Sequence, residues 1–226
     1  MIYVKIPRTA STFFESNFYN RFINYKGEHQ RIISVGHSWV YPTQIKGWRD
    51  WDYPNQPQGI FRDVLTYSIP RNETIITIVR NPFDLLISYF NYNWAWCRKF
   101  HNLSLDKNYP VSEFRKFVDI YLDDTIEFHA PALRKSLFSQ LKDIDGNWLI
   151  DDTSIILRFE NLDEDIKNFS NQYGIGISDT SKQAINSSGI KPIRLEFAYS
   201  NEQMEKLSKL WETDLKYFSY EPPITN

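Results

Sequence analysis

The sequence predicts an α/β fold: a single domain built on a central parallel sheet flanked by helices. The first observation is size, because 226 residues that are 42% hydrophobic can bury one proper core and suit one α/β domain better than two. The second is a set of short runs rich in Ile and Val, and the third is the helical patterns that lie between them. We therefore expect one domain that spans residues 1–226.

Four short apolar runs are the predicted strands of this sheet. Each is a few residues long, is rich in β-branched side chains and is apolar at successive positions, which is typical of parallel strands buried on both faces. The runs are Ile2 to Ile6, Arg31 to Val35, Thr74 to Val79 and Ser154 to Phe159.

Helical patterns separate these runs. Apolar residues from Phe114 to Leu122 recur at helical spacing, and Ser200 with Gln203 forms a capping-box pattern at the start of a further helix. Strands that alternate with helices in this way imply right-handed crossovers and a layered α/β fold.

Composition excludes several classes of protein. Lys and Arg total 26 against 28 Asp and Glu, so a net charge of −2 gives no general attraction to nucleic acid or to an anionic membrane. A single cysteine and four scattered histidines predict neither a disulfide framework nor a metal site. No apolar run is long enough for a signal peptide or a membrane span, so we expect a cytoplasmic protein.

The first predicted strand runs into a candidate anion site at residues 7–12. A strand that turns into a helix presents unpaired N–H groups and the positive end of the helix dipole, and Arg8 with several hydroxyl groups adds donors there. Residues 5–16 contain no glycine, so the Gly-x-x-x-x-Gly-Lys-Ser/Thr motif of nucleoside triphosphatases is missing. Taken alone, these Ser and Thr side chains are equally well read as helix caps.

A second strand-to-helix turn follows the run that ends at Val79. Arg80 comes directly after the strand, Asn81 is placed as an N-cap, and Pro82 is at the first helical position. The helix that follows carries Ser88. This turn is therefore a second candidate anion site.

Together these motifs resemble those of sulfotransferases. Arg80-Asn-Pro-Phe-Asp with Ser88 is similar to that family's 3′-phosphate motif, and Pro7-Arg8-Thr9-Ala10-Ser11-Thr12 is similar to its 5′-phosphosulfate loop. Three later segments resemble carbohydrate-type members in the family's order: residues 145–169, 186–203 and 211–222.

The resemblance implies a P-loop-like fold and a definite donor. The donor is 3′-phosphoadenosine 5′-phosphosulfate, the product is adenosine 3′,5′-bisphosphate, and no metal is required. The residues implied in nucleotide binding are Arg8, Thr9, Ala10, Ser11 and Thr12 at the phosphosulfate, Arg80 and Ser88 at the 3′-phosphate, Phe159 against adenine, and Lys191 closing over the nucleotide. Two departures stand out: Arg8 where many members have Lys, and Ala10-Ser11 in place of a common Gly pair.

An acceptor hydroxyl also needs a base. His37 lies two residues beyond a predicted strand, at the edge where parallel strands deliver Arg8 and Arg80, so we interpret it as the general base. Glu15 is the rival, although an acidic residue in a first helical turn is also a favourable partner of the helix dipole. A loop histidine bonded to a backbone group remains the alternative for His37.

An aromatic segment, residues 39–61, follows His37 and is the candidate acceptor site. Its Pro and Gly content argues against regular structure, and flat aromatic faces bind sugar rings. The candidate contacts are Trp39, Trp48, Trp51 and Tyr53. We expect a carbohydrate acceptor, with a small aromatic or lipid alcohol second; alternatively the tryptophans belong to a hydrophobic cluster.

Two other functions remain open at this point. A magnesium-dependent, kinase-like phosphotransferase needs paired carboxylates, but Asp63, Asp84 and Asp119 are scattered. A non-catalytic nucleotide-binding module of the same fold would lack the base or the cation that assists the leaving group. The sequence gives no oligomeric state.

Overall fold

The computed structural model describes twelve stretches and two single residues of the chain. These are residues 1–6, 9–10, 14, 18, 22–25, 28–31, 33–36, 39–40, 60–61, 74–101, 111–125, 136–142, 147–175 and 193–224. Within them, no helix is long and apolar enough to cross a membrane.

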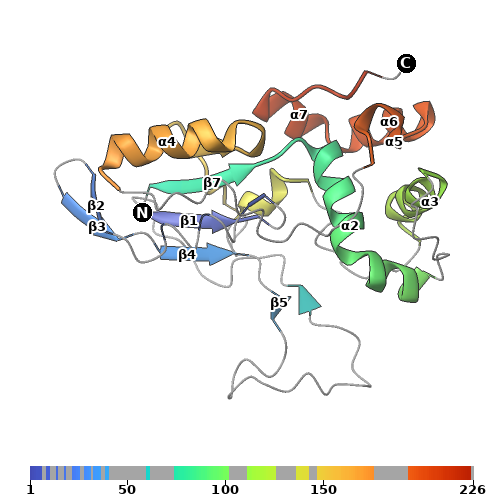
Figure 1. Ribbon diagram of the computed structural model, residues 1–226, viewed down its shortest axis with the longest axis horizontal. Helices are drawn as coiled ribbons and strands as arrows, with labels where there is room; N and C mark the ends of the chain where they lie inside the picture. The colour runs from blue at the N-terminus through green and yellow to red at the C-terminus, as the bar shows by residue number, and fades with distance from the viewer. Residues whose placement is uncertain are drawn as a thin grey trace.

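A four-stranded parallel sheet forms the centre of the fold (Figure 1). Its strands are β4 (Ile33–Gly36), β1 (Ile2–Lys5), β7 (Ile75–Val79) and β8 (Ile155–Arg158), in that spatial order. Each pair is parallel, with Ile2 opposite both Ile33 and Ile75, and Val79 opposite Arg158. The predicted α/β class, with its central parallel sheet, is therefore confirmed.

Two short antiparallel ladders accompany this sheet. Strand β2 (Phe22–Tyr25) pairs with β3 (Glu28–Arg31), so Arg31 belongs to this hairpin and not to the start of β4 as the sequence pattern predicted. Strand β5 (Trp39–Val40) pairs with β6 (Ile60–Phe61), beyond the β4 edge of the sheet (Figure 1). The segment predicted to be irregular is thus paired at its two ends.

The sheet separates two hydrophobic cores because neighbouring residues in a strand point to opposite faces. Val4 packs in one core and Tyr3 in the other. In β7, Ile75 and Val79 belong to the first core, while Ile76 and Ile78 belong to the second.

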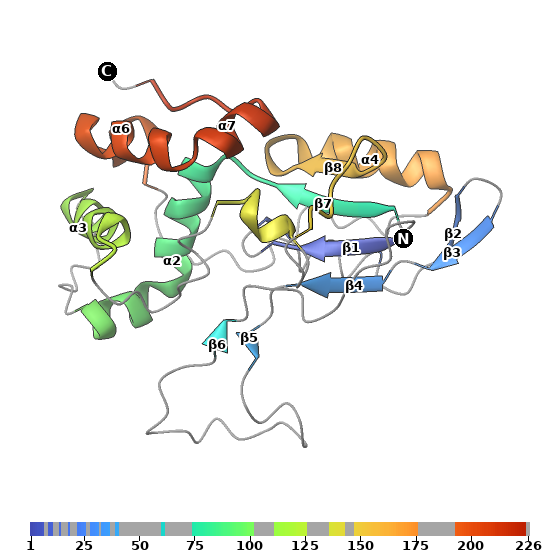
Figure 2. The same cartoon turned by 180° about the vertical axis from the view of Figure 1, so that it is seen from behind.

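Helices cover both faces. The first core contains residues of α2 (Pro82–His101), α3 (Val111–Leu122), α6 (Asn201–Leu210) and α7 (Glu212–Phe218). The second core contains residues of α4 (Leu162–Tyr173), together with Phe14 and Phe18. Figure 2 shows α2, α3, α6 and α7 toward the carboxyl ends of the strands, and α4 alongside β8. The remaining short helices are η3 (Ser139–Leu141), η4 (Phe159–Asn161) and α5 (Leu195–Ala198).

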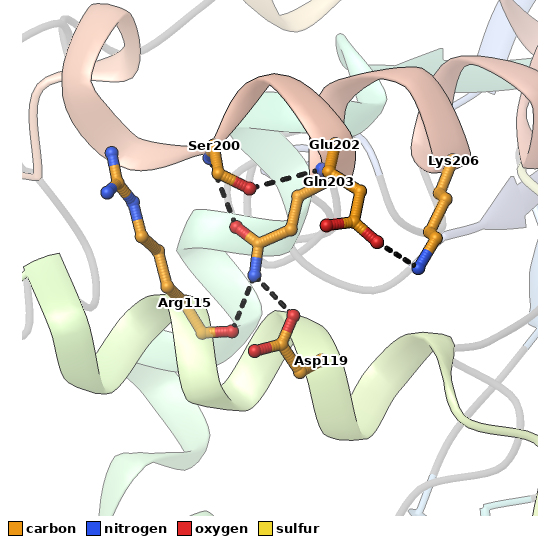
Figure 3. Close-up of polar contacts among 6 residues, drawn as sticks. All are labelled: Arg115, Asp119, Ser200, Glu202, Gln203 and Lys206. Atoms are coloured by element: carbon orange, nitrogen blue, oxygen red, sulfur yellow. Dashed lines mark hydrogen bonds and ion pairs between the residues drawn. The ribbon is translucent and has the colours of Figure 1, made fainter.

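A polar network fastens α5 and α6 to α3 (Figure 3). The Arg115 guanidinium donates to the carbonyls of Phe197, Ala198 and Tyr199 at 3.1 to 3.3 Å. Gln203 completes the predicted capping box with Ser200 and also donates to the Arg115 carbonyl. Since the Tyr199 hydroxyl donates to the Phe83 carbonyl, this network also fixes the first turn of α2.

A buried carboxylate ties α7 to the chain before η3. Asp214 is fully buried, and its two oxygens accept from the backbone N–H groups of Leu137 at 2.8 Å and Phe138 at 2.7 Å. Burial raises the pKa of Asp214 to about 6, and the hydrogen bonds oppose that rise. The contribution of Asp214 to stability is therefore complete below its ordinary pKa of 3.8 and is lost as the pH rises through about 6.

We expect the protein to gain stability from this group on mild acidification. Between pH 7 and pH 4 the protonation of Asp214 should add about 2–3 kcal/mol to the free energy of unfolding, since one pKa unit corresponds to 1.36 kcal/mol. Urea unfolding of the wild type and of Asp214→Asn across this pH range measures the difference between the two proteins. Parallel pH profiles would contradict the assignment.

Candidate functional site

The carboxyl ends of four parallel strands meet at one edge of the sheet. Chain order and spatial order differ here, because β1 connects onward to β4 on one side, whereas β7 connects to β8 on the other. The two connections leave in opposite directions between β1 and β7, and open α/β sheets bind their ligands at such a switch point. Both predicted anion loops follow these two strands.

The turn after β1 is built by Thr9 and Ala10. The Thr9 hydroxyl is buried and donates to the Ile6 carbonyl at 2.9 Å, so this side chain closes the turn. This differs from the expectation that the Thr9 hydroxyl faces a nucleotide, because a buried hydroxyl is satisfied most readily by the nearest carbonyl. Phe14 N–H donates to the Ala10 carbonyl at 3.0 Å, with the four-residue spacing of a helical hydrogen bond.

Ala10 adopts the left-handed backbone conformation, with φ of 61°. That conformation costs an L-residue on the order of 1 kcal/mol and costs glycine nothing. At the first position of the Gly pair common in sulfotransferases, Ala10 therefore keeps the backbone shape that glycine favours.

The turn after β7 is a well-capped helix N-terminus. Phe83 N–H donates to Asn81 Oδ1 at 3.0 Å, and α2 begins at Pro82, as the sequence predicted. Arg80 thus stands between the end of β7 and the positive end of a 20-residue helix. A phosphate bound here would meet both charges.

Arg80 is held against the end of β8. Its guanidinium carbon lies 4.0 Å from the centroid of the Phe159 ring, a cation–π contact. The ring predicted to pack on adenine therefore carries Arg80 on one face. The structure brings these two predicted residues together from neighbouring strand ends.

Ser88 and Asp84 lie on the same face of α2, because they are four residues apart. Ser88 is only 8% exposed, and Asp84 is half-buried. Burial raises the pKa of Asp84, Arg80 opposes the rise, and Glu160 adds to it. The charges of Arg80 and Glu160 thus act on the Asp84 carboxyl in opposite directions.

Sequence analysis placed Glu160 within the segment 145–169 that resembles sulfotransferases but gave it no role. Its Oε1 accepts from Asn81 N–H at 2.7 Å, and its Oε2 accepts from the Tyr220 hydroxyl at 2.9 Å. The available signal was its place directly after Phe159 at a strand end, but its partners lie 79 and 60 residues away along the chain. Local patterns do not reveal such contacts.

The other predicted site residues lie outside the described part of the chain. They are Arg8, Ser11, Thr12, Glu15, His37, Trp48, Trp51, Tyr53 and Lys191. Trp39 is described as part of the backbone of β5. The strand that precedes Arg8 and the strand that precedes His37 are neighbours, since Lys5 in β1 is opposite Gly36 in β4.

The described stretches of the chain contain no group of three His, Cys, Asp or Glu side chains that could hold a metal ion.

One comparison with known proteins gives a match over almost the whole chain. The sulfotransferase family matches residues 1–221. That family has a P-loop-like α/β fold, in agreement with the parallel sheet and its flanking helices. No curated protein and no solved structure matches the chain.

Proposed function

This chain belongs to the sulfotransferase family, and we propose that it transfers a sulfuryl group from 3′-phosphoadenosine 5′-phosphosulfate to an acceptor hydroxyl. The observation that carries the choice of donor is the pair of strand-to-helix turns after β1 and β7, on either side of the switch point. Two anion sites at one edge suit a nucleotide that carries phosphate groups at two positions. We propose that residues 1–226 form one sulfotransferase domain.

The turn after β7 takes the 3′-phosphate. Arg80 supplies a fixed positive charge, the start of α2 supplies the helix dipole, and Ser88 supplies a hydroxyl from the same helix. Phe159 holds the Arg80 guanidinium in place and borders the adenosine. From sequence resemblance alone, Lys191 is the residue proposed to close over the nucleotide.

The turn after β1 takes the 5′-phosphosulfate. Backbone N–H groups of the Thr9–Ala10 turn and the side chains of Arg8, Ser11 and Thr12 are the proposed donors. As the acceptor oxygen bonds to sulfur and the bond from sulfur to the bridging oxygen breaks, negative charge moves onto that bridging oxygen. Arg8 stabilises this charge electrostatically, because a guanidinium does not give up a proton near neutral pH.

His37 acts as the base in this reaction. It follows β4 directly, and neutral imidazole accepts a proton from the acceptor hydroxyl near pH 7. Glu15 is the alternative base, because the sequence pattern predicts it one turn into the helix that follows the first loop.

The proposed acceptor is a carbohydrate. The support is the aromatic content of residues 39–61, whose ends are closed by the β5–β6 ladder just beyond the end of β4. Lys46, Arg49 and Arg62 would meet a carboxylate or an existing sulfate on an acidic sugar.

Replacing Trp48 and Trp51 with alanine tests the acceptor site. We expect a higher KM for the acceptor, with the nucleotide affinity and the melting temperature unchanged, because stacking faces for the sugar are lost. Steady-state kinetics with varied acceptor and thermal unfolding measure these quantities. A large fall in melting temperature with unchanged acceptor kinetics would show that the two tryptophans are core residues.

Nucleotide selectivity tests the donor. Isothermal titration of the wild type should show tight binding of adenosine 3′,5′-bisphosphate, weaker binding of adenosine 5′-phosphate, and no dependence on Mg²⁺. Binding of ATP that requires Mg²⁺, together with no preference for the bisphosphate, would favour a kinase-like phosphotransferase instead.

A further inference from the structure

The ends of β7 and β8 are joined by two contacts between consecutive residues. Phe159 lies against the Arg80 guanidinium, and the next residue, Glu160, accepts the N–H of the residue after Arg80, which is Asn81. The Asn81 amide belongs to the same peptide group as the Arg80 carbonyl. Fixing this amide therefore fixes the backbone direction from which the Arg80 side chain leaves the strand.

The C-terminal segment Phe218–Glu221 is hydrogen-bonded to two of these residues, Glu160 and Asn81. The Tyr220 hydroxyl donates to Glu160 Oε2 at 2.9 Å, and Asn81 Nδ2 donates to the Glu221 carbonyl at 3.2 Å. These contacts span 60 and 140 residues of sequence. The segment is thus bonded both to the end of β7 and to the residue that follows Phe159.

Further contacts hold the C-terminal segment in position. Arg158, the last residue of β8, donates from Nη2 to the Phe218 carbonyl at 2.6 Å, and its guanidinium carbon lies 5.1 Å from the Tyr220 ring centroid. Ser219 has φ of 52° and ends α7, and Tyr220 N–H then donates to the Leu215 carbonyl at 2.9 Å. The backward turn at Ser219 is what brings Tyr220 to Glu160.

The hydrogen bond from Tyr220 to Glu160 needs a protonated tyrosine, and Tyr220 keeps its proton over a wide pH range. Burial, and then the negative charge of Glu160, raises the pKa of Tyr220, so its hydroxyl keeps the proton that it donates. An acidic side chain beside a phosphate site opposes phosphate binding by simple repulsion. This repulsion argues against Glu160 as a direct phosphate ligand. Its two hydrogen bonds indicate instead that it supports the residues around it.

We infer that Glu160 is a positioning residue, which together with the C-terminal segment Phe218–Glu221 holds Arg80 in the orientation that binds the 3′-phosphate. This inference rests on the proposed function and adds to it a specific cause of 3′-phosphate selectivity. A purely structural support would change stability without changing selectivity between nucleotides.

The test compares the affinities of adenosine 3′,5′-bisphosphate and adenosine 5′-phosphate by isothermal titration. Glu160→Ala should weaken binding of the bisphosphate about three- to tenfold, the loss expected for one hydrogen bond, and should leave binding of adenosine 5′-phosphate unchanged. Glu160→Gln keeps one acceptor oxygen and should restore the affinity to within about twofold of the wild type. If repulsion were the only role of Glu160, both variants would bind the bisphosphate more tightly.

A milder variant guards against a Glu160→Ala protein that does not fold. Tyr220→Phe removes one hydroxyl and should weaken binding of the bisphosphate about threefold, again without an effect on binding of adenosine 5′-phosphate. The matched control is Tyr217→Phe, which removes the same group from a tyrosine that is 45% exposed on α7 and should change neither affinity.

The possible outcomes distinguish a failure of the proposed function from a failure of this inference alone. A wild type that binds both nucleotides equally contradicts the proposed function and this inference together. A wild type that prefers the bisphosphate, with the full preference kept in Glu160→Ala and Tyr220→Phe, overturns the inference alone.

Discussion

Arg80→Ala is expected to weaken binding of adenosine 3′,5′-bisphosphate by at least tenfold while hardly affecting adenosine 5′-phosphate. A charge-assisted hydrogen bond contributes about 1.5–3 kcal/mol, and the variant loses this contribution only where a 3′-phosphate is present. The Arg80 guanidinium packs on the Phe159 ring just before α2, and the proposed phosphate contact is made from this position. Isothermal titration of both nucleotides measures the difference.

Two controls accompany Arg80→Ala. Lys209→Ala removes an exposed positive charge from α6 and should leave both affinities unchanged. Ser88→Ala should show the same selectivity as Arg80→Ala with a smaller loss, because a neutral hydroxyl contributes less than a charged group. Equal losses for the two nucleotides in Arg80→Ala would contradict the assignment.

His37→Ala should lower kcat by about a hundredfold or more and leave nucleotide affinity nearly intact, since a positioned base contributes two to four powers of ten in rate. Arg8→Ala should damage both quantities, because in the proposed reaction its cation contacts the donor in the ground state and in the transition state. Steady-state kinetics and nucleotide titration together separate the two roles. A severe effect of Glu15→Gln with a mild effect of His37→Ala would exchange the two candidates for the base.

The sequence predicted the sheet well because each strand is a local signal. The runs that became β1, β7 and β8 are apolar at successive positions, and each observed bound lies within one residue of the predicted one. Asn81 and Pro82 predicted the start of α2 for the same reason, since capping depends on neighbouring residues.

The supports of the site could not be predicted in this way. Glu160, Tyr220 and Asn81 meet only through the folded chain, and nothing in the local pattern around Tyr220 indicates a partner at the end of β8. The Thr9 hydroxyl was assigned to a ligand by its motif, but burial gives it the Ile6 carbonyl. The β2–β3 hairpin was missed because its strands lack an alternating apolar pattern, as in Glu28–Arg31.

The most direct test of the account is sulfuryl transfer itself. The wild-type protein is incubated with sulfur-labelled 3′-phosphoadenosine 5′-phosphosulfate and a panel of oligosaccharides, phenols, lipid alcohols and peptides, with and without EDTA. The account predicts labelled carbohydrate and an equal amount of adenosine 3′,5′-bisphosphate, both undiminished by the chelator. Tight binding of the nucleotide with no transfer to any acceptor, or group transfer that EDTA abolishes, would contradict it.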